Sequence, residues 1–154
     1  MNHDEFKLFL SFSQSLIPIK EFRSYIYKTK MLETIEDKFL EIWNKRREFC
    51  PQNQIVLSII NFQAPLSFHE DSLPKLATQN DLIESYVTLL EKTFEKNLRK
   101  NILNLLVNLA YCKKNKQSFL SKDVVPKYMI NNILWNYKST YHEKSLASQF
   151  LVNL

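Results

Sequence analysis

The chain has 154 residues, of which 45% are hydrophobic and 24% charged, and its formal net charge is +5. This length and composition indicate one folded domain over residues 1–154, with a hydrophobic core, and argue against a disordered chain. The sequence contains no glycine. Glycine-rich phosphate loops, nucleophile elbows and type I′ hairpins are therefore excluded, because each needs positive φ or a missing side chain. We expect an all-α protein and no catalytic residues.

Apolar residues recur at three- and four-residue intervals along most of the chain, which predicts a succession of amphipathic helices. In chain order the predicted helices are Asp4–Ser15, Ile19–Tyr27, Ile35–Phe49, Gln54–Gln63, a helix that Thr78 or Asn80 caps and that runs to Glu95, Asn97–Cys112, Asn115–Ser121, Val124–Tyr137 and Tyr141–Leu154. Two of the starts carry a capping-box signal, Thr34 with Asp37 and Thr140 with Glu143.

The aromatic residues, 13% of the chain, lie mostly at core spacing within these helices. Those predicted to lie in the core are Phe6, Phe9, Phe22, Phe39, Trp43, Tyr86, Phe94, Phe119 and Trp135. Aromatics placed in this way are more typical of a packed interior than of an exposed surface that stacks on nucleic-acid bases.

Metal and membrane functions find little support in the sequence. Cys50 and Cys112 lie 62 residues apart, and the histidines His3, His69 and His142 are scattered. No two of these residues have the i, i+3 or i+4 spacing of helical ligands, so we predict no metal site and no cofactor. The first residues do not resemble a signal peptide, and no apolar run approaches the roughly 20 residues of a membrane span. A reduced, cytoplasmic protein without membrane contact is expected.

One predicted helix, Asn97–Cys112, carries an unusual polar stripe. Asn97, Asn101, Asn104 and Asn108 are spaced four, three and four residues apart, which places their amides on one narrow face. Leucine, isoleucine, valine and alanine fill most of the remaining circumference, as in a helix buried on most sides. Since asparagine is a mediocre helix former, helix propensity does not explain the stripe.

The sequence also repeats internally. The triplets Leu10-Ser11-Phe12, Ile60-Asn61-Phe62, Val107-Asn108-Leu109 and Val152-Asn153-Leu154 have central residues 50, 47 and 45 positions apart. A period of about 40–47 residues with two or three helices per unit is typical of armadillo and HEAT repeats. We therefore predict an armadillo/HEAT-like right-handed superhelical solenoid with about two full repeats and a partial repeat at each end, forming part of a longer repeat protein.

The segment 105–129, LLVNLAYCKKNKQSFLSKDVVPKYM, resembles the armadillo pattern. It has a buried third helix ending in "LxNLA", a polar turn, a short helix, and then "V-P-x-Φ" into the second helix. The chain departs from the family pattern after the short helix, where the family usually has glycine. The residues at this point are Lys122-Asp123 in this segment and Thr29-Lys30 in the earlier repeat. The phrasing NLAYCKKNKQSFL also resembles the armadillo-like repeats of rotatin-type centriolar proteins. That resemblance implies a role in centriole assembly at the centrosome or ciliary base, through binding of other centriolar proteins.

In armadillo proteins the third helices line a groove, and the "LxNLA" asparagine hydrogen-bonds the backbone of an extended peptide. The resemblance therefore implies a peptide-binding groove in a non-catalytic scaffold. Candidate groove residues are Asn61, Asn101, Asn104, Asn108, Asn153, Gln54 and Gln149, with Lys7 on the first helix adding weak basic character. The alternative is that these amides only solvate an exposed helix face.

The family's nuclear-import members also carry a tryptophan four residues before that asparagine. Leu57, Asn104 and Gln149 occupy the corresponding positions here. This difference argues against recognition of basic nuclear signals.

Two basic clusters suggest an alternative function. Lys45-Arg46-Arg47 is one, and Lys113-Lys114 with Lys116 is the other. They would suit a nucleic acid or another acidic surface, but interspersed acids favour a solvated surface, so a nucleic-acid partner is not preferred.

The ends of the chain suggest self-association. Stacked repeats expose their terminal faces unless these are capped. The apolar residues expected on those faces are Phe6, Phe9, Phe12 and Leu16 at one end, and Leu146, Phe150, Leu151, Val152 and Leu154 at the other. Such faces predict either continuation of the array or self-association.

Overall fold

The computed structural model describes residues 3–45, 54–76, 80–93 and 95–154, and every regular element in these ranges is helical. The all-α prediction is therefore confirmed. The chain divides into two compact units, Met1–Leu76 and Ala77–Leu154, and each is described by itself. The expected single domain over 1–154 remains a prediction.

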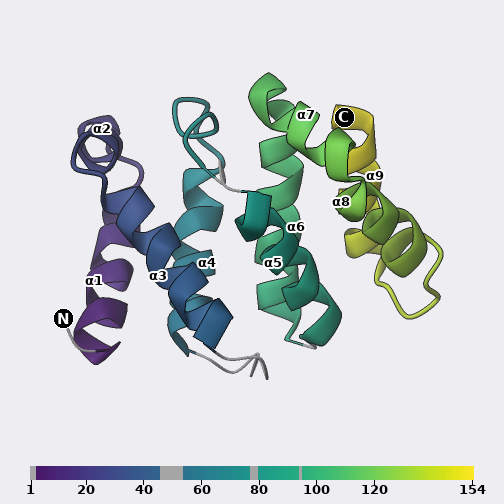
Figure 1. The fold of residues 1–154 in the computed structure, drawn as a ribbon, viewed down its shortest axis with the longest axis horizontal. Helices are drawn as coiled ribbons and strands as arrows, with labels where there is room; N and C mark the ends of the chain where they lie inside the picture. Colours follow the sequence, from purple (N-terminus) through teal and green to yellow (C-terminus); the bar gives the residue numbers. More distant parts are fainter. Residues whose placement is uncertain (1–2, 46–53, 77–79, 94) are drawn as a thin grey trace. The chain divides into compact units, whose positions relative to one another are not determined.

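The first unit contains four α-helices within the described part: α1 (His3–Leu16), α2 (Lys20–Lys28), α3 (Met31–Lys45) and α4 (Gln54–Leu66). Helix α1 packs along α4, and α3 contacts both α2 and α4. Helix α2 is seen nearly end-on in Figure 1, so it lies across the axis of α1. The amphipathic helices of the first unit meet in a core that includes Leu10, Ile35, Phe39, Ile59 and Phe62.

A buried arginine fastens the C-terminal ends of α1 and α4. Arg23 Nη1 donates to the carbonyls of Ile17 and Pro18, at 2.9 and 3.1 Å, just beyond α1. Its Nε donates to both carboxylate oxygens of Asp71, at 3.1 and 3.2 Å, in the turns after α4. A cation at the ends of helices is favourable because it meets the partial negative charge of the last carbonyls.

The second unit has the same succession of elements after its first helix. These elements are α5 (Asn80–Lys92), α6 (Lys96–Tyr111), α7 (Lys113–Lys122), α8 (Val124–Tyr128), the π-helix η1 (Met129–Leu134) and α9 (Tyr141–Asn153). Helix α6 packs along α9, and α8 with η1 covers α5 and α9. Phe119 of α7 packs edge-to-face on Phe150 of α9, with ring centroids 5.1 Å apart.

Within each unit, the helices that carry the repeated triplets pack on each other. Ser11 and Asn61 lie on the pair α1 and α4, whereas Asn108 and Asn153 lie on the pair α6 and α9. Each pair is joined by a short helix followed by a second helical segment, as the repeat predicts. A continuous superhelical solenoid depends on how the two units are placed, so it stays a prediction.

Several predicted helix boundaries are wrong, among them the end of α4, which lies at Leu66 and not at Gln63. Thr34 lies inside α3, where its amide donates to Lys30 O at 3.0 Å, so it does not cap that helix. Helix α5 ends at Lys92, and Glu95 instead caps α6 by accepting from the amides of the second and third helical residues. The expected helix Val124–Tyr137 is α-helical for five residues, continues as a π-helix and ends at Leu134. In contrast, the capping box of Thr140 and Glu143 is present.

The turns in which the armadillo family usually has glycine are left-handed in this structure. Lys30 has φ 57° and Asp123 has φ 42°, and they are the non-glycine residues with positive φ in the described chain. These positions lie between α2 and α3 and between α7 and α8. The turns thus keep the conformation that glycine favours, at a cost in backbone strain that aspartate tolerates better than lysine.

The core prediction holds for four of the eight predicted aromatics that the structure describes, and Phe22 and Trp43 are half-buried. Phe39, Tyr86 and Phe119 are fully buried, whereas Trp135 is 80% exposed and was wrongly predicted as core. Phe9 is also partly exposed, and Phe94 lies outside the described residues.

The expected terminal apolar faces are only partly exposed. Phe6, Leu146 and Phe150 are buried, because they pack inside their units. Phe12 and Val152 remain exposed. None of the helices described is both long enough and apolar enough to cross a bilayer.

Candidate functional site

The predicted asparagine stripe forms an accessible strip on α6. The apolar side chains of this helix are buried, from Leu98 to Ala110. Asn101, Asn104 and Asn108 are half-buried, and Asn97 at the start of the helix is exposed. We call these four residues the amide strip. It spans about 16 Å along the helix axis, at about 1.5 Å per residue.

The predicted groove residues of the first unit lie on the α1–α4 pair. Asn61 is half-buried on α4, and Gln54 is exposed seven residues earlier, near the same face. The side-chain oxygen of Gln54 accepts a hydrogen bond from Lys7 Nζ on α1 at 2.9 Å. The structure therefore brings together Gln54 and Lys7, which we predicted from the sequence to lie on one weakly basic surface.

The predicted residues on α9 are less uniform. Gln149 is exposed, but the side-chain nitrogen of Asn153 is buried and has no hydrogen-bond partner among the described residues. The Asn153 amide therefore offers less to a ligand than the amides on α6.

The two basic clusters belong to different units. Lys45 ends α3, and Arg46 and Arg47 lie outside the described residues. Lys113 and Lys114 are exposed in the first turn of α7, and Lys116 is half-buried. These lysines follow the last turn of α6. They lie about 20 Å along its axis from Lys96, Arg99 and Lys100 at its start, so the lysines of α7 do not form one patch with those basic residues.

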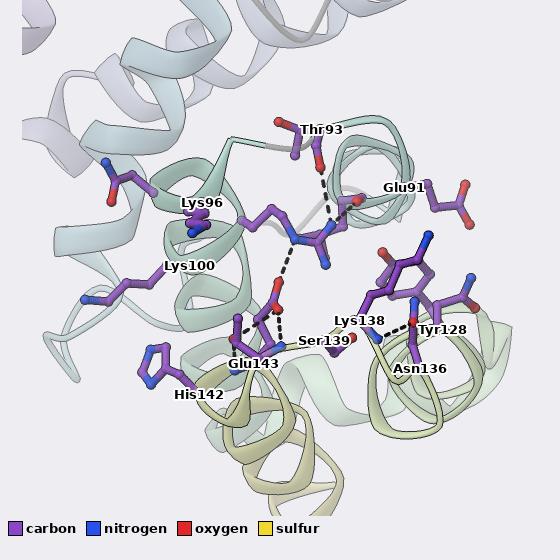
Figure 2. Close-up of a pocket in the computed structure, with 15 residues that line it drawn as sticks. Glu91, Thr93, Lys96, Lys100, Tyr128, Asn136, Lys138, Ser139, His142 and Glu143 are labelled. Carbon is purple, nitrogen blue, oxygen red and sulfur yellow. Dashed lines mark hydrogen bonds and ion pairs between the residues drawn. The ribbon is translucent and has the colours of Figure 1, made fainter.

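The structure also reveals a cleft of about 630 Å³ in the second unit, which sequence reasoning did not find. It lies where the end of α5, the first turns of α6 and α9 and one face of α8–η1 meet. Figure 2 shows Lys96, Lys100 and His142 on one side of Glu143, and Tyr128, Asn136 and Lys138 on the other. The inner wall includes buried Leu90, Thr93 and Tyr128.

An ion pair fixes the base of this cleft. Arg99 Nε donates to Glu143 Oε1 at 2.6 Å, and both side chains are mostly shielded from solvent. Arg99 Nη1 donates to the carbonyls of Leu90 and Thr93 at the end of α5. Glu143 also accepts from the amide and hydroxyl of Thr140, at 2.8 and 3.0 Å, as part of the α9 capping box. One arginine and one carboxylate therefore join the ends of three helices (Figure 2).

The local environment shifts two pKa values in the cleft. Burial by itself would raise the pKa of Glu143, but the hydrogen bond from the Thr140 amide and the Arg99 guanidinium outweigh it and lower this pKa below its ordinary value of 4.5. Burial raises the pKa of Tyr128 above 10.0, against the opposing effect of Arg99. At neutral pH the site therefore holds an ionised carboxylate and a neutral phenol that can donate a hydrogen bond.

Sequence reasoning could have found part of this site. Tyr128, Asn132 and Asn136 all line the cleft and lie four residues apart in the sequence, which is the spacing of one helical face, although Asn136 follows the end of the helix. The capping box of Thr140 and Glu143 was visible in the sequence, but its partner Arg99 was not, because 44 residues separate the paired groups. Histidine, cysteine, aspartate and glutamate side chains do not gather in any group of three or more that could hold a metal ion, within the part of the chain described.

Comparison of the chain with protein-family models, with curated proteins and with solved structures found no match. What the structure establishes is the class: an all-α protein of two compact helical units, the second of which carries an amide strip and a polar cleft. The armadillo-like and centriolar resemblances remain predictions.

Proposed function

We propose that this chain is a non-catalytic protein–protein interaction scaffold that binds an extended segment of a partner along the amide strip of α6. The observation that carries the proposal is the exposure pattern of this helix. Between Leu98 and Ala110, solvent reaches Arg99, Lys100 and three amides, whereas every apolar side chain is buried. A face made of amides offers donors and acceptors without an apolar area that would promote aggregation.

The dimensions suit a short peptide. A strip of about 16 Å matches about five residues of extended chain, at roughly 3.3 Å per residue. An amide side chain carries both a donor and an acceptor for the main chain of a peptide, so binding would not require a particular sequence. On the α1–α4 pair, Asn61, Gln54 and Lys7 offer a second polar surface of the same kind.

The resemblance to armadillo-like repeats extends this proposal. The packing of triplet-bearing helices within each unit supports a repeat architecture, and we propose that the units stack as an armadillo/HEAT-like solenoid. The resemblance to rotatin-type proteins suggests a partner in centriole assembly and a location at the centrosome or ciliary base. We place the chain among protein-binding scaffolds and not among enzymes.

The test is a double substitution, Asn104→Ala with Asn108→Ala. We expect stability within about 1 kcal/mol of the parent, because half-buried amides on a packed helix contribute little to folding. We expect loss of the proteins retained by the parent chain in a quantitative pull-down with mass spectrometry. Gln117→Ala, an exposed amide on α7, is the matched control and should retain them. An identical set of proteins for the double variant and the control would reject the amide strip as the binding surface.

A further inference from the structure

The charges around the cleft favour an anionic ligand. Four cations and two carboxylates line it: Lys96, Arg99, Lys100, Lys138, Glu91 and Glu143. The ion pair of Arg99 and Glu143 is internal, which leaves three lysines against one glutamate. These four side chains are exposed, so a ligand's carboxylates could meet the lysines at the rim without the desolvation cost of a buried charge.

Amides from two different helical elements line the cleft. Asn97 comes from the first turn of α6, and Asn132 from η1, with Asn136 just beyond it. The oxygen of Asn136 accepts from the backbone amide of Lys138 at 2.9 Å, so Asn97 and Asn132 are the amides best placed to meet a ligand. Amide groups from two separate elements suit the alternating N–H and C=O groups of a peptide main chain.

The size of the cleft and its inner wall favour a peptide over a nucleic acid. Its volume of about 630 Å³ lies within the usual range of roughly 300–1,000 Å³ for ligand sites. That volume accommodates one or two side chains beside the phenol of Tyr128. Single-stranded nucleic acids are usually held by exposed aromatic faces on which bases stack. Tyr128, the tyrosine that lines the cleft, is only 6% exposed, and the exposed Trp135, Tyr137 and Tyr141 adjoin lining residues in the sequence without lining the cleft themselves.

We propose that this cleft binds an acidic peptide segment of a partner protein, with Asn97 and Asn132 holding its main chain and Lys96, Lys100 and Lys138 holding its carboxylates. This assignment does not depend on the use of the amide strip beyond Asn97. It gives the second unit a binding site with a stated partner chemistry, separate from the surface of α6 between Asn101 and Asn108.

The test measures fluorescence anisotropy of a rhodamine-labelled library of eight-residue peptides with glutamate at alternate positions and mixed residues between them. The 154-residue chain should bind this library and should not bind the same library with lysine in place of glutamate. Lys138→Glu should weaken binding about tenfold, whereas Lys114→Glu, the same charge change outside the cleft on α7, should weaken it less than about twofold. Asn132→Ala should weaken binding about fivefold, and its neighbour Asn131→Ala should not.

Each contrary outcome overturns the assignment. Equal losses for Lys138→Glu and Lys114→Glu would show attraction by net charge alone. Tighter binding of a labelled decathymidine than of the glutamate library would indicate a nucleic-acid site. Loss of library binding in the Asn104→Ala/Asn108→Ala variant would place the peptide on the amide strip, whereas retained binding in that variant separates this inference from the proposed function. Circular dichroism checks that each variant is folded.

Discussion

The two compact units use the same kind of arginine at opposite ends of their packed helix pairs. Arg23 joins the C-terminal ends of α1 and α4, and Arg99 joins the N-terminal ends of α6 and α9. Each guanidinium donates to backbone carbonyls through Nη1 and to a distant carboxylate through Nε. The carboxylate partners differ in exposure: the side chain of Asp71 is 38% exposed and that of Glu143 is 14% exposed.

This difference shows how position decides what an ion pair does. At the C-terminal ends, the cation is favoured by the carbonyls just beyond α1 to which it donates, and Asp71 adds a partly hydrated partner. At the N-terminal ends, the helices favour an anion, so Glu143 is the group that the local dipoles stabilise and Arg99 compensates its burial. The pair of Arg99 and Glu143 lines a cleft, whereas the pair of Arg23 and Asp71 links the turns that follow α1 and α4.

The largest expected effect comes from removing each arginine. Arg99→Met should lower the free energy of unfolding by about 3 kcal/mol, because it leaves a mostly buried carboxylate without its cation. Arg23→Met should cost less, about 2 kcal/mol, because water can reach Asp71 while two carbonyls lose a donor. Urea unfolding followed by circular dichroism measures both changes. The exposed Lys114→Met is the control, with less than about 0.5 kcal/mol; a larger loss for Arg23→Met than for Arg99→Met would contradict the comparison.

The carboxylates should show the same order with smaller effects. Glu143→Gln should cost about 2 kcal/mol at pH 7, and Asp71→Asn less than about 1 kcal/mol. Because the folded-state pKa of Glu143 is lowered from 4.5, its contribution is complete above that value and is lost as the pH falls through the folded-state pKa.

The difference in unfolding free energy between the parent and Glu143→Gln should therefore shrink between pH 5 and pH 3. Urea titrations at several pH values would measure it. A gap that does not change with pH would show that Glu143 acts through packing and not through its charge.

The smallest effects concern the left-handed turns. Lys30→Gly should stabilise the chain by about 0.5–1 kcal/mol, because lysine at φ 57° carries backbone strain that glycine lacks. Asp123→Gly should change stability by less than about 0.5 kcal/mol, because aspartate tolerates this conformation and its exposed ion pair with Lys127 Nζ, at 2.8 Å, would be lost. Thermal unfolding compares them, with Ser24→Gly, at an exposed position in the interior of α2, as a destabilising control. Destabilisation by Lys30→Gly would show that the lysine side chain matters more than its backbone.

Local sequence signals predicted the helices well and the cleft poorly. Apolar periodicity located the helices and the buried face of α6, since it depends only on neighbours along one helix. The capping box at Thr140 was equally local. The predicted cap at Thr34 was wrong because α3 starts after the left-handed Lys30, and lysine is not a residue type that predicts this conformation. Trp135 was wrongly predicted to lie in the core because the apolar spacing continues past Leu134, where the helix ends.

The cleft escaped prediction because it depends on contacts between distant segments. Arg99 was one of several cations near the start of α6, and nothing in the sequence distinguished it as the partner of Glu143. The amide strip was predicted because its members share one helix, whereas Asn97 and Asn132 line the same cleft only after α6 and η1 are placed in the second unit. The left-handed turns lie between these cases, since the family resemblance marked their positions and the structure supplied their conformation.

The exposure of Trp135 has a practical consequence for studying the molecule. The chain has two tryptophans, and each unit contains one. Trp43 is half-buried and stacks on Phe39, with ring centroids 6.1 Å apart, whereas Trp135 is 80% exposed and directly precedes the cleft residue Asn136. A shielded indole emits at shorter wavelength than a hydrated one and is less accessible to iodide. The unlabelled chain therefore carries two distinguishable fluorophores, one reporting on each helical unit and the second lying beside the peptide site we propose.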